Sequence, residues 1–201
     1  MALIRKTLLA LMLVALALPN TADAQASKTE KLFLNVTLGA QGLYFDADGI
    51  DASDPGGSIS FRAGWGFSEL FTLYLSLNGA EMQGDDNPFI EDDYEWGALE
   101  LGGRFNFRSG KPFVPFADVA LRAVAVVRED IDLEYLGAGM TIGGGAAYYL
   151  TPSVALELGL RLGWGGFNEV DQSTVMLDFD PDDFGYAESR LSFGLVFYPM
   201  R

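Results

Sequence analysis

The sequence contains no cysteine and no histidine. Without cysteine there are no disulfides, so an exported protein of this sequence needs another source of stability. Without either residue, the Ser–His and Cys–His pairs that activate most nucleophiles cannot form. Positive charge is also scarce: 13 Lys and Arg stand against 28 Asp and Glu, a net charge of −15. Because phosphate binding needs a basic surface, we expect no nucleic-acid partner. Because the usual nucleophile pairs cannot form, we expect no enzymatic activity, and we expect no cofactor.

Long apolar runs are missing beyond the N-terminal region. In the N-terminal region, a basic segment precedes an apolar stretch at 8–18 and a small-residue cleavage site at 21–24. This pattern predicts a signal peptide over 1–24 and one exported domain over 25–201; the alternative is a retained N-terminal anchor. No later stretch approaches the roughly eighteen apolar residues of a helical span. The exported chain is therefore either soluble or crosses a membrane as a closed barrel.

Alternating residues favour the barrel. From Val154 to Trp164 every second residue is large and apolar, and the residues between them are small or charged. Strict alternation predicts an extended strand whose two faces meet different surroundings. A soluble sheet turns a well-hydrated polar face outward, whereas here the polar face is mostly small. The apolar face runs for about ten residues, the length of a membrane-crossing strand.

Seven other segments repeat this alternation, at about 32–44, 58–67, 71–79, 99–107, 118–127, 137–149 and 190–197. The predicted connections are short at 68–70, 108–112 and 150–153, and long near 46–57, 81–95, 128–136 and 165–188. Alternately short and long connections are typical of outer-membrane barrels. We therefore predict an all-β protein, an eight-stranded antiparallel up-and-down transmembrane β-barrel with both exported ends on the short-turn side.

Aromatic residues gather near the predicted strand ends. The predicted girdle consists of Trp65, Phe67, Phe71, Phe105, Phe107, Tyr148 and Phe197 near the short turns and Trp164 near the long loops. We also place Phe45, Tyr94, Trp96 and Tyr186 in the band near the long loops, and Phe116 and Tyr198 in the band near the short turns. Amphipathic rings favour the headgroup level of a bilayer, so two bands indicate two interfaces. The alternative is the ordinary enrichment of aromatics in strands.

With these features the chain resembles the small OmpA-like outer-membrane β-barrel family, the outer membrane protein β-barrel domain. The resemblance is carried by the signal peptide, the Gly-rich sixth strand, the 148–152 turn, the 111–116 strand entry and the apolar last strand. It departs from the family at its end: such barrels usually finish on an aromatic residue, and this chain continues to Arg201. The resemblance implies a multi-pass protein of the cell outer membrane in contact with its lipid. The oligomeric state stays open, with a monomer favoured.

Charged residues fall on the predicted inner faces of the strands: Arg62, Glu100, Arg104, Asp118, Arg122, Glu157, Arg161 and Arg190. An eight-stranded barrel is barely wide enough for its side chains, and an unpaired charge there is costly. The acids must therefore pair with the arginines, most simply along one strand, Glu100 with Arg104 and Glu157 with Arg161. We predict a lumen plugged by side chains and a structural or surface-exposed role. The alternatives are a small-solute or hydrophobic-compound channel and, third, a soluble lipocalin-like periplasmic carrier.

Acidic residues concentrate in the predicted long connections, which hold 22 of the 28 and a single base, Arg128. Carboxylate oxygens are ligands for hard cations. The candidate divalent-cation ligands are Asp46, Asp48, Asp51, Asp178, Asp180 and Asp182. Neither acidic segment, 46–54 or 178–183, matches the full twelve-residue calcium loop. The alternative is a solvated anionic rim.

Three consecutive glycines, 143–145, lie within the sixth predicted strand. No helix follows them, so they do not form a phosphate-binding loop. We expect them to leave space in the lumen for bulky side chains of other strands.

Overall fold

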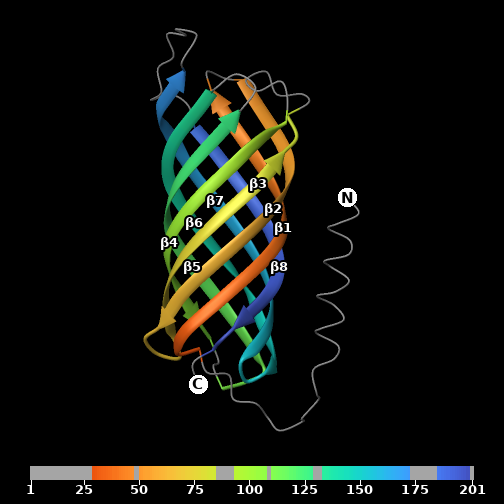
Figure 1. Ribbon diagram of the computed structural model, residues 1–201, viewed down its shortest axis with the longest axis vertical. Helices are drawn as coiled ribbons and strands as arrows, with labels where there is room; N and C mark the ends of the chain where they lie inside the picture. The colour runs from red at the N-terminus through yellow and green to blue at the C-terminus, as the bar shows by residue number, and fades with distance from the viewer. Residues whose placement is uncertain are drawn as a thin grey trace.

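Eight strands form a closed antiparallel barrel (Figure 1). This computed structural model describes residues 29–47, 50–84, 93–107, 110–128, 133–172 and 185–199. The strands are β1 (Lys31–Ala47), β2 (Ile50–Gly66), β3 (Phe71–Met82), β4 (Tyr94–Asn106), β5 (Phe113–Arg128), β6 (Leu133–Thr151), β7 (Val154–Gln172) and β8 (Gly185–Phe197). Each strand pairs with the next, and β1 pairs with β8. The predicted fold class is confirmed, whereas the predicted signal peptide lies outside the described residues.

The three short connections lie together at the lower end of the barrel in Figure 1. Side-chain hydroxyls shape two of them. The Ser68 hydroxyl accepts a hydrogen bond from the Phe71 amide at 3.1 Å. The Thr151 hydroxyl accepts bonds from the amides of Ser153 and Val154 at 3.2 and 3.1 Å. Such local bonds satisfy backbone donors where the ladder stops, so these short turns can link neighbouring strands directly.

Apolar side chains cover the outside of all eight strands. Large outward residues such as Leu158 on β7 and Leu75 on β3 are 55% and 50% exposed. A continuous apolar belt of this kind far exceeds the patches found on soluble monomers, and it is the surface that a bilayer covers. Within the described residues, no helix is both long and apolar enough to cross a membrane. The soluble-carrier alternative, which needs a polar exterior, does not fit this belt.

Three predicted long loops are shorter than expected, because the ladder continues into them. Ala47 pairs with Ile50 and Arg128 with Leu133, so the predicted loops at 46–57 and 128–136 are short connections. The predicted loop at 165–188 shrinks but stays long, because β7 runs to Gln172 and β8 begins at Gly185. Beyond the apolar belt the outward positions no longer face lipid, and β2 carries Pro55 and Gly57 there. The outer and inner faces of the strands therefore no longer differ in residue type there, although the backbone ladder continues.

The longer strands change where the candidate cation ligands lie. Asp46 and Asp51 lie directly opposite each other on β1 and β2, within the strand ladder and not in a loop. The other four, Asp48, Asp178, Asp180 and Asp182, lie outside the described residues.

The eight girdle aromatics all lie on the outer face. At the lower end, the rings of Phe67, Phe71 and Phe105 form a row with centroids 6.4 and 5.3 Å apart. The prediction for six other rings is wrong. Buried inside the barrel are Phe45, Tyr94, Trp96, Phe116, Tyr186 and Tyr198. Their positions have the inward parity of their strands, which nearness to a strand end does not reveal.

Candidate functional site

The charged interior divides into two groups, which we call the lower and the upper ion cluster. The lower ion cluster consists of Arg62, Arg104, Asp118, Glu157 and Arg161. The Arg104 Nη1 lies 2.6 Å from Glu157 Oε2, and the Arg161 Nη2 lies 2.9 Å from Asp118 Oδ2. Arg62 bridges both acids, with its Nη1 at 3.6 Å from Glu157 Oε1 and 4.0 Å from Asp118 Oδ2. These contacts join β2, β4, β5 and β7 across the lumen.

The upper ion cluster consists of Glu100, Arg122, Glu188 and Arg190. The Arg190 Nη2 lies 2.9 Å from Glu100 Oε1, and its Nε lies 3.5 Å from Glu188 Oε1. Arg122 forms an ion pair with Glu188 from the opposite side. The Thr141 hydroxyl on β6 donates a hydrogen bond to Glu100 at 3.3 Å. This cluster therefore ties β4, β5 and β6 to β8.

All eight charged residues predicted to face the lumen lie there, each at most 4% exposed. Sequence reasoning missed two buried acids, Glu188 and Asp54, because it placed both in long loops. Counting from Arg190 along β8 in steps of two gives Glu188 the inward parity. The eight predicted residues are five arginines and three acids, an excess of positive charge, but with these two the described interior holds five arginines and five acids and the charges balance.

The predicted pairing along single strands is also largely wrong. Glu100 lies against Arg190 of β8, not Arg104. Glu157 is closest to Arg104 of β4, and its contact with Arg161 of its own strand is longer, at 3.9 Å. Residues four apart on a strand are separated by about 13 Å along the backbone. Side chains that reach across the narrow lumen meet more closely than those that reach along it.

Above the ions lies a buried group that we call the upper apolar cluster: Leu43, Phe45, Ala80, Met82, Tyr94, Trp96, Ala98, Val124, Val126, Phe167 and Tyr186. The ring centroids of Trp96 and Tyr186 lie 5.1 Å apart, and those of Phe167 and Tyr186 lie 5.3 Å apart. The Tyr94 hydroxyl donates a 2.7 Å hydrogen bond to Asp54 on β2. Aromatic packing therefore fills the lumen at its long-loop end.

A lower apolar cluster fills the opposite end, and consists of Phe33, Tyr74, Val114, Ala120, Ala147, Tyr149, Ala155, Val196 and Tyr198. Tyr198 follows β8, and its amide donates to the Ser153 carbonyl at 2.8 Å. Its ring stacks on Tyr149 with centroids 5.8 Å apart. Burial raises the pKa of the Tyr198 phenol, which stays neutral at ordinary pH. The lumen is thus apolar, then charged, then apolar along the barrel axis.

Aromatic rings pack against guanidinium groups of both ion clusters. The Arg104 guanidinium lies 3.5 Å from the centre of the Phe116 ring, and that of Arg62 lies 4.7 Å from the Tyr74 ring. Arg122 lies 5.6 Å from the ring of Trp96. Cation–π contacts of this kind stabilise a charge that has lost its water.

Glycines on β6 and β7 make room for these side chains. A Cβ at Gly143 would lie 2.6 Å from Asp118 Oδ1 and 2.7 Å from Arg161 Cγ, and a Cβ at Gly163 would overlap the Arg122 guanidinium. A Cβ at Gly145 would likewise crowd the ring of Phe116. The expectation that the 143–145 run leaves lumen space is confirmed for Gly143 and Gly145.

Comparison with known proteins agrees with this architecture. The sequence matches the family model of the outer membrane protein beta-barrel domain over residues 8–197. Neisserial surface protein A is 20% identical, with a TM-score of 0.55 over 84% of this chain and 99% of its own. OprG from Pseudomonas aeruginosa is 11% identical, with a TM-score of 0.50 over 87% and 98%. AlkL, solved in lipid bilayers, is 12% identical, with a TM-score of 0.52 over 90% and 95%. At identities this low, the structural likeness shows a shared fold alone. No curated protein matches the sequence.

Proposed function

Because the chain belongs to the outer membrane protein beta-barrel family and is an integral multi-pass protein of the outer membrane, we propose that it is a non-enzymatic, structural or surface-exposed barrel closed by its own side chains. The observation that carries the proposal is the layered lumen. An ion or solute would have to cross two aromatic-rich apolar layers and a charge-paired layer between them.

The absence of enzymatic activity is part of the proposal. The chain has no histidine or cysteine, so the commonest activated nucleophiles cannot form. The buried carboxylates of the two ion clusters lie against arginines and behind apolar side chains. A substrate entering from either end would first have to displace those layers.

Planar-bilayer recordings test the closed lumen. Folded barrel is identified by its different gel mobility before and after boiling. This folded protein is expected to give no steady conductance. Regular openings would contradict the proposal and support a small-solute channel. If the ion selectivity of those openings changes in Arg104→Ser or Arg122→Ser but not in the lipid-facing control Leu121→Ala, the path runs through the ion clusters.

We also propose that divalent cations bind at the outer rim. Glu81 and Glu95 are exposed and directly opposite each other on β3 and β4. Like charges in such cross-strand positions are destabilising, and a bridging divalent cation removes the repulsion. Among the described residues, no group of three or more acidic side chains could hold a metal ion, so we propose loose bridging and not a built cage.

Urea unfolding in vesicles tests the cation proposal. Millimolar Mg²⁺ should raise the midpoint more than NaCl of equal ionic strength, because NaCl only screens the charges. The variant Glu81→Gln/Glu95→Gln should lose part of that difference. If the two salts raise the midpoint equally, the cation proposal is wrong and the rim is a solvated anionic surface.

We further propose that the barrel is a monomer, because β1 and β8 close the ladder and leave no strand edge to pair with a second copy. Sedimentation of the folded protein in detergent tests this, and a dimer mass would contradict it.

A further inference from the structure

The buried charges balance over the whole interior but not within the ion clusters. Asp54, the fifth buried acid, stands apart at the long-loop end, where it accepts the hydrogen bond of Tyr94. It lies eight positions along β2 from Arg62, a separation of about 26 Å. Among the described residues, the two ion clusters therefore hold five arginines and four acids. One positive charge in the middle of the lumen has no acid of its own.

Hydrogen bonds identify the arginine in excess. Each acid of the clusters accepts a hydrogen bond from one arginine: Glu157 from Arg104, Asp118 from Arg161, Glu100 from Arg190 and Glu188 from Arg122. Arg62 is the fifth arginine. Its Nη1 lies 3.6 Å from Glu157 and 4.0 Å from Asp118, too far for a hydrogen bond. Neither Nη1 nor Nε of Arg62 has a hydrogen-bond partner.

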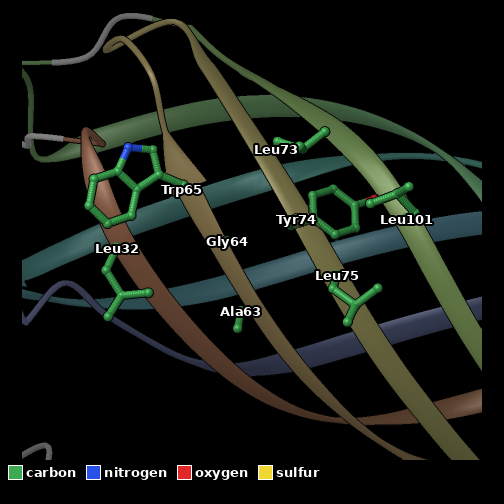
Figure 2. A pocket seen from close by; sticks show the side chains of 8 residues that line it. All are labelled: Leu32, Ala63, Gly64, Trp65, Leu73, Tyr74, Leu75 and Leu101. Atoms are coloured by element: carbon green, nitrogen blue, oxygen red, sulfur yellow. The ribbon is translucent and has the colours of Figure 1, made fainter.

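The protein groups around Arg62 do not replace the missing acid. The residue is 3% exposed, and a buried charge without a counter-ion is costly. Its guanidinium lies 4.7 Å from the ring of Tyr74, which stands on β3 opposite Gly64 of β2 (Figure 2), and this contact offsets only part of the cost. Arg161 adds repulsion, because both guanidinium groups lie within 4.0 Å of the same Asp118 oxygen. The lower ion cluster therefore favours one further negative charge.

The wall beside Arg62 offers a second hydrogen-bond donor. Ser76 stands directly opposite Arg62 in the β2–β3 ladder, so their Cβ atoms are about 4.5–5.5 Å apart on the inner face. Ser76 is 1% exposed, and its hydroxyl has no hydrogen-bond partner. On the other side of Arg62 stands Asn35 of β1, whose amide donates to the Leu195 carbonyl. Both neighbours are short side chains, so only a small ligand fits between them and the guanidinium.

We propose that the lower ion cluster binds one small monovalent anion of about the size of chloride, held by Arg62 Nε and the Ser76 hydroxyl. A water molecule can bond to the same donors, but it cannot neutralise the charge. Because an apolar cluster covers the lumen at each end, the anion enters as the barrel folds and exchanges slowly afterwards. It is a structural ion of the folded barrel.

Urea unfolding in vesicles tests the anion site. Chloride replaces gluconate at constant ionic strength, without divalent cations. Above the dissociation constant, each tenfold rise in chloride should raise the free energy of unfolding by about 1.4 kcal/mol, the slope for one bound ion. Bromide should act like chloride, whereas gluconate is too large to fit. A free energy of unfolding that does not change with chloride would overturn the proposal.

Variants locate the effect. Arg62→Met leaves the four hydrogen-bonded ion pairs in place and should abolish the dependence on chloride. The control Lys111→Met removes an exposed cation and should keep the dependence. If Arg62→Met does not fold, Ser76→Ala should raise the chloride concentration for half the effect about tenfold, and Ser58→Ala, the same change elsewhere on the inner face, should not. A dependence that is unchanged in Arg62→Met or in Ser76→Ala would overturn the proposal.

Diffraction shows the ion directly. Crystals of barrel refolded in bromide should give an anomalous peak at hydrogen-bond distance from Arg62 Nε. A bonded water without anomalous signal would overturn the proposal. Either result leaves the closed lumen untouched, since conductance is measured separately. The comparison of Mg²⁺ with NaCl at the outer rim is made with saturating chloride in both samples, so the two tests stay independent.

Discussion

Glu157 holds the lower ion cluster together, so neutralising it should cost more stability than removing an arginine beside it. Its carboxylate lies 2.6 Å from Arg104, 3.6 Å from Arg62 and 3.9 Å from Arg161. Glu157→Gln keeps the shape but leaves three guanidinium groups with Asp118 as the one remaining acid of that cluster. Arg104→Met instead leaves two arginines and two acids, which still balance.

The expected magnitudes follow from that count. Breaking a buried ion pair so that charge is left uncompensated costs about 3–5 kcal/mol, and Glu157→Gln should fall in this range. Arg104→Met leaves Glu157 two other cationic neighbours, so we expect about 1–3 kcal/mol, the cost of a lost hydrogen bond at a buried group. Because the two residues are in contact, the double variant should cost less than the sum by about 0.5–3 kcal/mol.

Reversible urea unfolding in phospholipid vesicles, followed by tryptophan fluorescence, gives the free energies of unfolding by linear extrapolation. The control is Glu95→Gln, the same chemical change at an exposed position, which in buffer without divalent cations should not lower stability, because it relieves repulsion with Glu81 of about 0.2–1 kcal/mol. The reasoning is refuted if Glu157→Gln costs no more than Arg104→Met, or if the double variant is additive.

Three further outcomes are expected in the same unfolding assay. Leu158→Arg, which puts a charge on the lipid face, should cost about 2–4 kcal/mol, and Leu158→Met very little; equal stabilities would mean that the face assignment is wrong. Gly163→Ala should cost about 1–3 kcal/mol, because its Cβ overlaps Arg122, whereas a Cβ at the control site Gly57 meets nothing within 4 Å; a neutral Gly163→Ala would contradict the close packing. Tyr94→Phe removes a 2.7 Å hydrogen bond to a buried carboxylate on β2, so we expect a loss of about 1–3 kcal/mol, and an unchanged midpoint would show that this bond adds no stability.

The strands could be predicted from the sequence wherever both of their faces have strong requirements. On β7, Leu158 faces lipid while Glu157 and Arg161 face the lumen, so the alternation is plain. Near the outer end, positions such as Ser53 and Pro55 on β2 meet neither lipid nor a crowded lumen. Alternation fails there, which is why the ladder up to Ala47 and Ile50 was missed.

The pairing of the ions could not be predicted from the sequence. Parity along each strand gives the inward face, and it placed Arg104 and Glu157 correctly. Their contact joins β4 to β7, strands that are not neighbours in the ladder. Such a contact depends on the tilt of the strands and the stagger of their register around the barrel. Alternation within single strands does not record that geometry.

The contacts made by β8 bear on how the chain assembles. Arg122 and Glu100 lie on β5 and β4, and their partners Glu188 and Arg190 both lie on the last strand. Glu100 and Arg122 also face each other across the β4–β5 ladder, so in a sheet without β8 each has the other as its nearest opposite charge. The last strand supplies both counter-charges and the final ladder with β1 in one step. Truncation before β8 therefore removes the β1–β8 ladder and two of the interior charge partners, Glu188 and Arg190, at once.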